Sequence, residues 1–150
     1  MPQSLAKMVV HLTFSTKHRR PFITADVRDD LKAYLRAILE DVESPAIEIN
    51  SVADHVHLLF CLSRKHALAE AVEQIKKGSS KWIKTKSPAF ADFYWQSGYG
   101  AFSVSQSNVA AVRAYIVGQD DHHRKMTFQD EFRALLKKHG IEFDEKYVWD

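Results

Sequence analysis

Residues 55–62 restrict the possible fold more than any other segment of this chain. Successive side chains of a β-strand point to opposite faces, so His55 and His57 share one face of this segment. The residues on the other face are apolar, namely Val56, Leu58 and Phe60. The apolar face has to be covered by other elements, whereas the imidazoles need polar partners or an ion. We therefore expect a sheet with helices on one face and a functional site on the other.

The periodicity of the remaining sequence predicts an α+β fold. Residues 8–16 alternate between apolar and more polar side chains, which is typical of a half-buried strand. The predicted strands are residues 8–16, 46–52, 55–62 and a segment within 93–105. The predicted helices run from Thr24 or Asp26 to Ser44-Pro45, over residues 67–84, from Ser107 or Asn108 to about Gln119, and over 127–139. This β-α-β-β-α-β order, followed by further helices, matches a ferredoxin-like antiparallel sheet with helices on one face.

The composition indicates one ordinary globular domain over residues 1–150. The chain has only four prolines and five glycines, which argues against a flexible linker between domains. Its single cysteine, Cys61, excludes an internal disulfide and suits a reducing compartment. We see neither a signal peptide nor an apolar run long enough to span a bilayer. The expectation is a cytoplasmic protein without a membrane partner.

The two histidines of the strand are candidate metal ligands. Imidazoles two residues apart on one strand face can bind one divalent ion. Two ligands hold an ion weakly, so a third has to come from another part of the chain. Asp54 precedes the pair and either orients a histidine by a hydrogen bond or shapes the turn between strands. The motif alone is equally consistent with two ordinary histidines that have hydrogen-bond partners.

A second candidate group lies on the helix predicted around residues 111–119. Tyr115 and Gln119 are four residues apart and therefore share one helix face. A tyrosine hydroxyl can attack a phosphodiester and hold the DNA covalently, which conserves the bond energy and requires no nucleotide cofactor. A nearby divalent ion would stabilise the charge that develops, and Gln119 offers a carbonyl oxygen as the third ligand. An amphipathic helix with a surface tyrosine would explain the same pattern without any chemistry.

Several sequence blocks, in this order, carry a family resemblance over nearly the whole chain. They are residues 14–21, 54–59, 77–82, 95–104, 115–119, 122–123 and 137–141. With them the chain resembles the HUH-type single-tyrosine transposases of small bacterial and archaeal insertion sequences, to which the REP-associated tyrosine transposases are related. That family has the ferredoxin-like fold, with C-terminal helices that carry the nucleophile.

The resemblance implies a role for four residues. His55, His57 and Gln119 would bind a divalent metal, Mg²⁺ or Mn²⁺. Tyr115 would be the nucleophile that forms a 5′-phosphotyrosine link and releases a 3′-hydroxyl. The resemblance also implies recognition of single-stranded DNA hairpins at the element ends. Finally, it implies a homodimer whose active sites combine the histidines of one subunit with the tyrosine helix of the other.

Two basic parts of the chain are candidate phosphate contacts. One consists of Lys17, Arg19 and Arg20. The other lies within residues 64–86, where seven basic residues stand against two acidic ones. Its expected DNA contacts are Lys77, Ser79, Lys81, Trp82 and Lys84, with Trp82 available for base stacking. A solvated helix face with a tryptophan in the core explains this second part equally well.

The residues that follow the tyrosine helix are a third candidate for DNA contact. They include His122, His123 and Arg124, which could contact the scissile strand. A second metal site there is a weaker possibility, because adjacent side chains on a helix diverge.

Other functions stay open at this point. A non-catalytic single-stranded nucleic-acid-binding domain could have the same fold, although residues 8–16 and 55–62 lack the exposed aromatics that such sheets use. An HUH replication or mobilisation nickase shares the metal and tyrosine chemistry but usually carries further domains. A two-histidine phosphoesterase would need two separate His-x-Ser or His-x-Thr strands, and the chain has one His-x-His.

Overall fold

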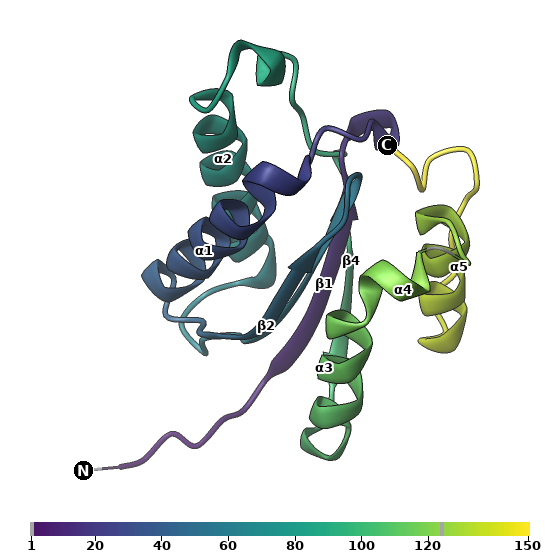
Figure 1. The fold of residues 1–150 in the computed structure, drawn as a ribbon. Helices are drawn as coiled ribbons and strands as arrows, with labels where there is room; N and C mark the ends of the chain where they lie inside the picture. The colour runs from purple at the N-terminus through teal and green to yellow at the C-terminus, as the bar shows by residue number, and fades with distance from the viewer. Residues whose placement is uncertain (1, 124) are drawn as a thin grey trace.

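The computed structural model describes residues 2–123 and 125–150, so Arg124 lies outside the described residues. The strands are β1 (Val9–Ser15), β2 (Ala46–Ser51), β3 (His55–Cys61) and β4 (Gly100–Val104). The helices are α1 (Ala25–Asp41), α2 (Leu68–Lys84), α3 (Val109–Val117), α4 (Gln119–His122) and α5 (Phe128–Lys138). The sheet forms the middle layer, with α1 and α2 on one side and α3, α4 and α5 on the other (Figure 1). None of the helices in the described part of the chain is long and apolar enough to cross a bilayer.

The sheet is the predicted ferredoxin-like one. Its strand order is β2-β3-β1-β4, and every neighbouring pair is antiparallel. In the register of β1, Thr13 lies opposite His57 of β3, and His11 lies opposite Phe102 of β4. The two histidines therefore lie on an inner strand of the sheet, beside β1.

The main core lies between the sheet and helices α1 and α2, as the alternation of β3 predicts. Val56, Leu58 and Phe60 are fully buried there. Helix α1 contributes Leu31 and Leu35 to the same cluster, and their spacing of four residues places them on one face of the helix. Each such side chain contributes roughly 1.5–3 kcal/mol of burial free energy. This core fixes β3 so that its histidines project from the opposite face.

The expectation that β1 is half-buried is wrong. All seven residues of the strand are buried. The side of β1 that carries Val9 and His11 is covered as well, because the C-terminal helices pack there. Val9 belongs to a second cluster with Leu59 and with Ile116 of α3. Strand β1 is thus enclosed on both faces, which a period-two pattern with polar residues on one side does not reveal.

The helix predicted from residue 107 or 108 to 119 is interrupted. It ends at Val117, Gly118 has non-helical dihedral angles, and α4 begins at Gln119. The amide Nδ2 of Asn50 on β2 donates a hydrogen bond to the carbonyl of Ile116 (2.8 Å). A carbonyl at the end of α3 is thereby satisfied, and the end of the helix is fixed to the sheet.

Helix α5 packs over β4 through an aromatic contact. Phe128, Phe132 and Leu136 form a third cluster with Phe102 of β4. The glycine at the start of β4 makes this approach possible, since a Cβ on Gly100 would lie 2.7 Å from the Phe132 ring. The close contact fixes the face of α5 that carries Glu131 above the histidines.

Candidate active site

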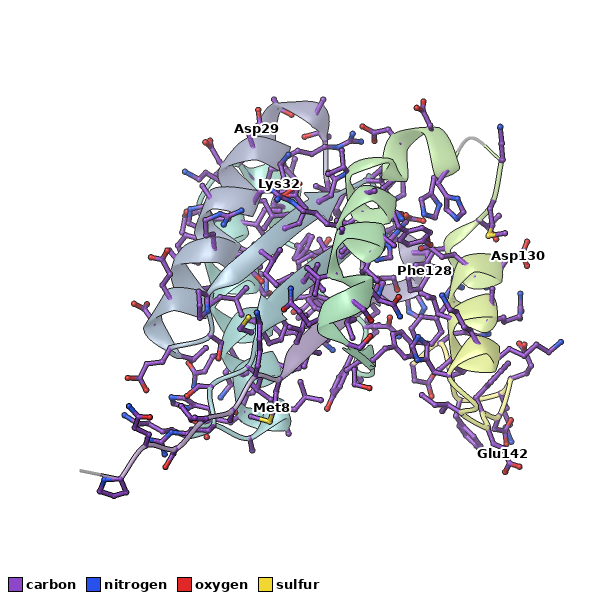
Figure 2. The ribbon with its side chains drawn as sticks, turned by 90° about the horizontal axis from the view of Figure 1, so that it is seen from below. Met8, Asp29, Lys32, Phe128, Asp130 and Glu142 are labelled. Carbon is purple, nitrogen blue, oxygen red and sulfur yellow. The ribbon has the colours of Figure 1, made fainter. Side chains whose placement is uncertain are left out.

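The site lies between the sheet and the C-terminal helices. His55 and His57 are buried on β3, and Gln119 is buried at the start of α4. Figure 2 shows the start of α5, where Phe128 and Asp130 are labelled, on the far side of the molecule from α1. The site is therefore separated from helices α1 and α2 by the sheet.

Each of the two histidines has a hydrogen-bond partner at its Nδ1 atom. His55 Nδ1 donates to the carboxylate of Asp54 at 2.7 Å, which confirms Asp54 as an orienting partner. His57 Nδ1 lies 2.8 Å from Nε2 of His11 on β1. Burial, followed by the neighbouring His57, lowers the pKa of His11 to about 3, so the ring stays neutral and can accept this bond. A ring that donates from Nδ1 presents a lone pair at Nε2, and both Nε2 atoms face the same centre.

The carboxylate of Glu131 lies at that centre. Its Oε1 atom is 2.9 Å from His57 Nε2, 3.4 Å from His55 Nε2 and 3.2 Å from His123 Nε2. The Nε2 atoms of His55 and His123 are 3.0 Å apart. Glu131 has only 1% of its side chain exposed. Three imidazoles therefore converge on one carboxylate oxygen in a buried space.

The second oxygen of Glu131 faces the predicted nucleophile. Tyr115 donates its hydroxyl hydrogen to Glu131 Oε2, and Gln119 Nε2 donates to the same atom at 3.1 Å. With its amide nitrogen so placed, Gln119 directs Oε1 towards His55 Nε2, at 3.5 Å. His122 lies nearby, with Nε2 3.5 Å from the Tyr115 oxygen. The interruption at Gly118 therefore leaves Tyr115 and Gln119 in the same site.

The electrostatics of the site favour a cation. Burial raises the pKa of the Glu131 carboxyl, but hydrogen bonds to His123, His55 and His57 outweigh it and hold that pKa well below its usual range. Burial lowers the pKa of His55, yet the bonds to Asp54 and Glu131 leave it raised. The imidazoles thus compensate the buried carboxylate through hydrogen bonds, and a divalent ion among the same Nε2 and Oε1 atoms could supply the positive charge in their place.

The donors present fit a divalent metal. Imidazole nitrogens, a carboxylate oxygen and an amide oxygen are ligands of first-row divalent ions. The ligand atoms of His55, His57, His123 and Glu131 all lie within 4.8 Å of one another. Both strand histidines have a partner on the other ring nitrogen, which is the usual arrangement around a bound metal. His55, His57 and Gln119 would hold such an ion.

Tyr115 is half-buried and is held as a neutral phenol. Burial, and then the Glu131 carboxylate, raise its pKa above the usual range. Its ring makes an edge contact with His57, with centroids 5.9 Å apart. The cavity beside it, of about 460 Å³, lies between β4, α3 and α5. Phe102, Val112 and Leu135 contribute to its walls. Tyr115 itself also lines this cavity.

The basic segment at Lys17 lies at the histidine end of the sheet. The backbone amide of Thr16 donates to the carbonyl of Asp54 at 2.8 Å, so the segment starts beside the site. Each of the three basic side chains lies over an aromatic ring: Lys17 over Tyr94, Arg19 over Trp149 and Arg20 over Phe22. The expected contacts on α2 lie in the opposite layer. Figure 1 shows the sheet between them and the C-terminal helices.

The DNA contacts expected on α2 differ in burial. Ser79 as a DNA contact is wrong, because the residue is fully buried. Its hydroxyl donates to the Ile75 carbonyl and accepts from the Trp95 indole. Trp82 is half-buried and stacked on Tyr34, with centroids 5.1 Å apart. The lysines at positions 77, 81 and 84 are not buried, so Lys77, Lys81 and Lys84 remain predicted contacts.

Sequence reasoning missed two residues of the site. Glu131 lies between Phe128 and Phe132 on the apolar face of α5, and an acidic residue within such a stripe is the signal that indicates it. His11 shares the polar side of β1 with Thr13, a position that gives no such signal. His123, which stays a predicted DNA contact, also belongs to the imidazole cluster.

Comparisons with known proteins show which proteins this chain is similar to. Residues 4–119 match the family described as "Transposase IS200 like". The ISDra2 transposase TnpA of Deinococcus radiodurans is 28% identical over 116 residues, which cover 74% of this chain and 83% of that protein. A crystal structure assigned to a transposase of Deinococcus radiodurans R1 has a TM-score of 0.62 at 26% identity, and the match covers 79% of this chain and 98% of that one.

A more distant structure shares the fold. It is a REP-associated tyrosine transposase bound to a REP hairpin, with a TM-score of 0.62 at 14% identity. The match covers 82% of this chain and 73% of that one. The match to the family ends at residue 119, so His122, His123 and Glu131 lie beyond it.

Proposed function

Because this chain belongs to the family of IS200-like transposases, we propose that it cleaves and rejoins single-stranded DNA through a 5′-phosphotyrosine intermediate. The observation that carries the proposal is the convergence of Tyr115 on His55 and His57, which we propose to bind the metal. The tyrosine hydroxyl and the His57 imidazole contact the same carboxylate, that of Glu131. All three residues belong to one chain.

The chemistry follows from these positions. A divalent ion bound by His55, His57 and Gln119 would polarise the scissile phosphate and stabilise the charge that develops on it. The Tyr115 oxygen attacks the phosphorus, a bond to the 5′ phosphate forms, and the bond to O3′ breaks. The tyrosine loses its proton and the leaving O3′ gains one, so the step is balanced. Attack by another 3′-hydroxyl on the phosphotyrosine reverses it and joins a new strand.

Single-stranded DNA, folded into a hairpin near the cleavage site, is the substrate that we propose. The related REP-associated transposase is described as bound to a REP hairpin. In this chain, Lys17 and Arg20 start at the edge of the site and suit phosphate contacts. The cavity beside Tyr115 would admit the single strand that leads to the scissile phosphate.

The test is a covalent adduct with a defined polarity. We expect the protein, with Mn²⁺ or Mg²⁺, to retain the label of single-stranded hairpin oligonucleotides labelled at the 3′ end. When the same oligonucleotides are labelled at the 5′ end, the label should instead appear on a released DNA fragment that ends in a 3′-hydroxyl. EDTA should prevent both. Retention of the 5′ label would contradict the proposed polarity, and a lack of any adduct with either metal would refute the proposed function.

The proposal extends to the assembly. The family resemblance predicts a homodimer with shared sites, in which α3 reaches the histidines of the other subunit. In this chain, Tyr115 already lies beside His57, and Asn50 holds the end of α3 on the sheet. We therefore propose that each site closes within one chain, whether or not two chains form a homodimer.

Mixing two inactive variants distinguishes closed from shared sites. A His57→Ala protein and a Tyr115→Phe protein are combined under conditions in which subunits exchange. With closed sites, we expect no adduct, because no chain holds both parts. With shared sites, about one quarter of all sites would be complete in an equal mixture, and the adduct would form on the His57→Ala chain. An adduct on that chain would therefore refute closure.

A further inference from the structure

The Glu131 carboxylate lies where the metal-binding half of the site meets the nucleophile. Its Oε1 atom faces the imidazoles, at 2.9 Å from His57 Nε2 and 3.4 Å from His55 Nε2. Its Oε2 atom accepts the hydrogen bond of Tyr115. One rigid carboxylate thus contacts both groups that the reaction requires.

The burial of this carboxylate calls for an explanation. Glu131 lies on the apolar face of α5, between Phe128 and Phe132, and is almost completely buried. A buried carboxylate is costly unless a positive charge or several hydrogen bonds compensate it. Among its described partners there is no lysine or arginine, and the imidazoles carry a charge only when protonated. A divalent ion at Oε1 would supply a positive charge that does not depend on protonation of the imidazoles.

The distances between the donors match those around an ion. Two donor atoms that each lie about 2.1 Å from one ion, at angles of about 90° to 110°, are about 3.0–3.4 Å apart. From Glu131 Oε1 to the Nε2 atoms of His57, His123 and His55, the separations are 2.9, 3.2 and 3.4 Å. A carboxylate oxygen is also a stronger donor to a divalent ion than the neutral amide oxygen of Gln119.

We propose that Glu131 is a metal ligand of this chain, binding the ion through Oε1 beside His55 and His57 while Oε2 holds the Tyr115 hydroxyl at the site. This proposal rests on the proposed function, which supplies the reaction that the bound ion would serve. It assigns a ligand to α5, which lies beyond the residues that match the family, 4–119. The metal centre would then depend on the C-terminal part of the chain as well as on the family's own residues.

Metal affinity, rather than activity, tests this role. We expect Glu131→Gln to weaken Mn²⁺ binding at least about tenfold, since the isosteric amide keeps the shape but loses the charge. The measurement is a titration in which the EPR signal of free Mn²⁺ gives the dissociation constant. The control is Glu142→Gln, the same chemical change at an exposed residue, which Figure 2 shows beyond the far end of α5 from Phe128. It should bind Mn²⁺ as the wild type does.

Thermal unfolding shows whether the variant folds. In EDTA, we expect Glu131→Gln to unfold cooperatively but at a lower temperature than the wild type, because the neutral amide loses the charged hydrogen bonds that the carboxylate makes with the imidazoles and Tyr115. Saturating Mn²⁺ should raise the unfolding temperature of the wild type more than that of the variant. A folded Glu131→Gln protein with unchanged Mn²⁺ affinity would overturn the proposal. A wild type that binds Mn²⁺ through Glu131 but forms no DNA adduct would support the ligand and sink the proposed function.

Discussion

Tyr115→Phe should abolish the covalent DNA adduct and reduce cleavage by at least about a thousandfold, as is typical when a nucleophile is removed. The substitution removes only the hydroxyl. The ring keeps its contacts with His57 and its place beside Leu59 and Ile116. One hydrogen bond to Glu131 is lost, so the free energy of unfolding should change by no more than about 1–2 kcal/mol. The measurement is adduct formation with 3′-labelled single-stranded hairpins in Mn²⁺.

Binding and a matched tyrosine separate chemistry from structure in this experiment. Tyr115→Phe should bind the hairpins as the wild type does, because the scissile phosphate is the only part of the DNA that the lost hydroxyl would contact. Tyr147→Phe is the control, since Tyr147 is 58% exposed and lies in the C-terminal segment away from the histidines. It should form the adduct at the wild-type rate. A Tyr115→Phe protein that still forms the adduct would show that another residue is the nucleophile.

The parts of the site that the sequence predicts are those set by local periodicity. His55 and His57 share a face because a strand has a period of two, and Val56 and Leu58 decide which face packs against α1 and α2. The order of strands and helices follows from equally local patterns, and the antiparallel sheet confirms it. Tyr115 and Gln119 reach one site through their spacing of four residues, even though the helix is interrupted between them.

The parts that the sequence does not predict arise from tertiary packing. Glu131 reaches the histidines only because Phe132 packs on Phe102, and no local pattern gives the angle at which α5 crosses the sheet. His11 becomes the partner of His57 through the pairing of β1 with β3, which is a long-range contact. Ser79 is buried because Trp95 closes over it, from a segment sixteen residues further along the chain.

His57→Ala should abolish adduct formation and strongly weaken Mn²⁺ binding. The substitution removes a ligand at the centre of the site, which should weaken Mn²⁺ binding by about a hundredfold or more. It also leaves His11 without its partner at 2.8 Å, and Glu131 without its shortest imidazole contact, at 2.9 Å. Gln119→Ala should have a smaller effect on affinity, because a neutral amide oxygen is a weaker donor than imidazole.

Removal of the metal from the wild type should abolish adduct formation as His57→Ala does. This comparison shows whether the variant is inactive because it lacks the metal. EDTA should stop adduct formation, and added Mn²⁺ should restore it in the wild type but not in His57→Ala. The matched control is His66→Ala, because His66 pairs with Glu70 at the start of α2 and has no contact with the site. It should keep the wild-type affinity and rate. Full adduct formation in EDTA would contradict the metal mechanism, since the histidines would then serve only to hold Glu131 and Tyr115 in place.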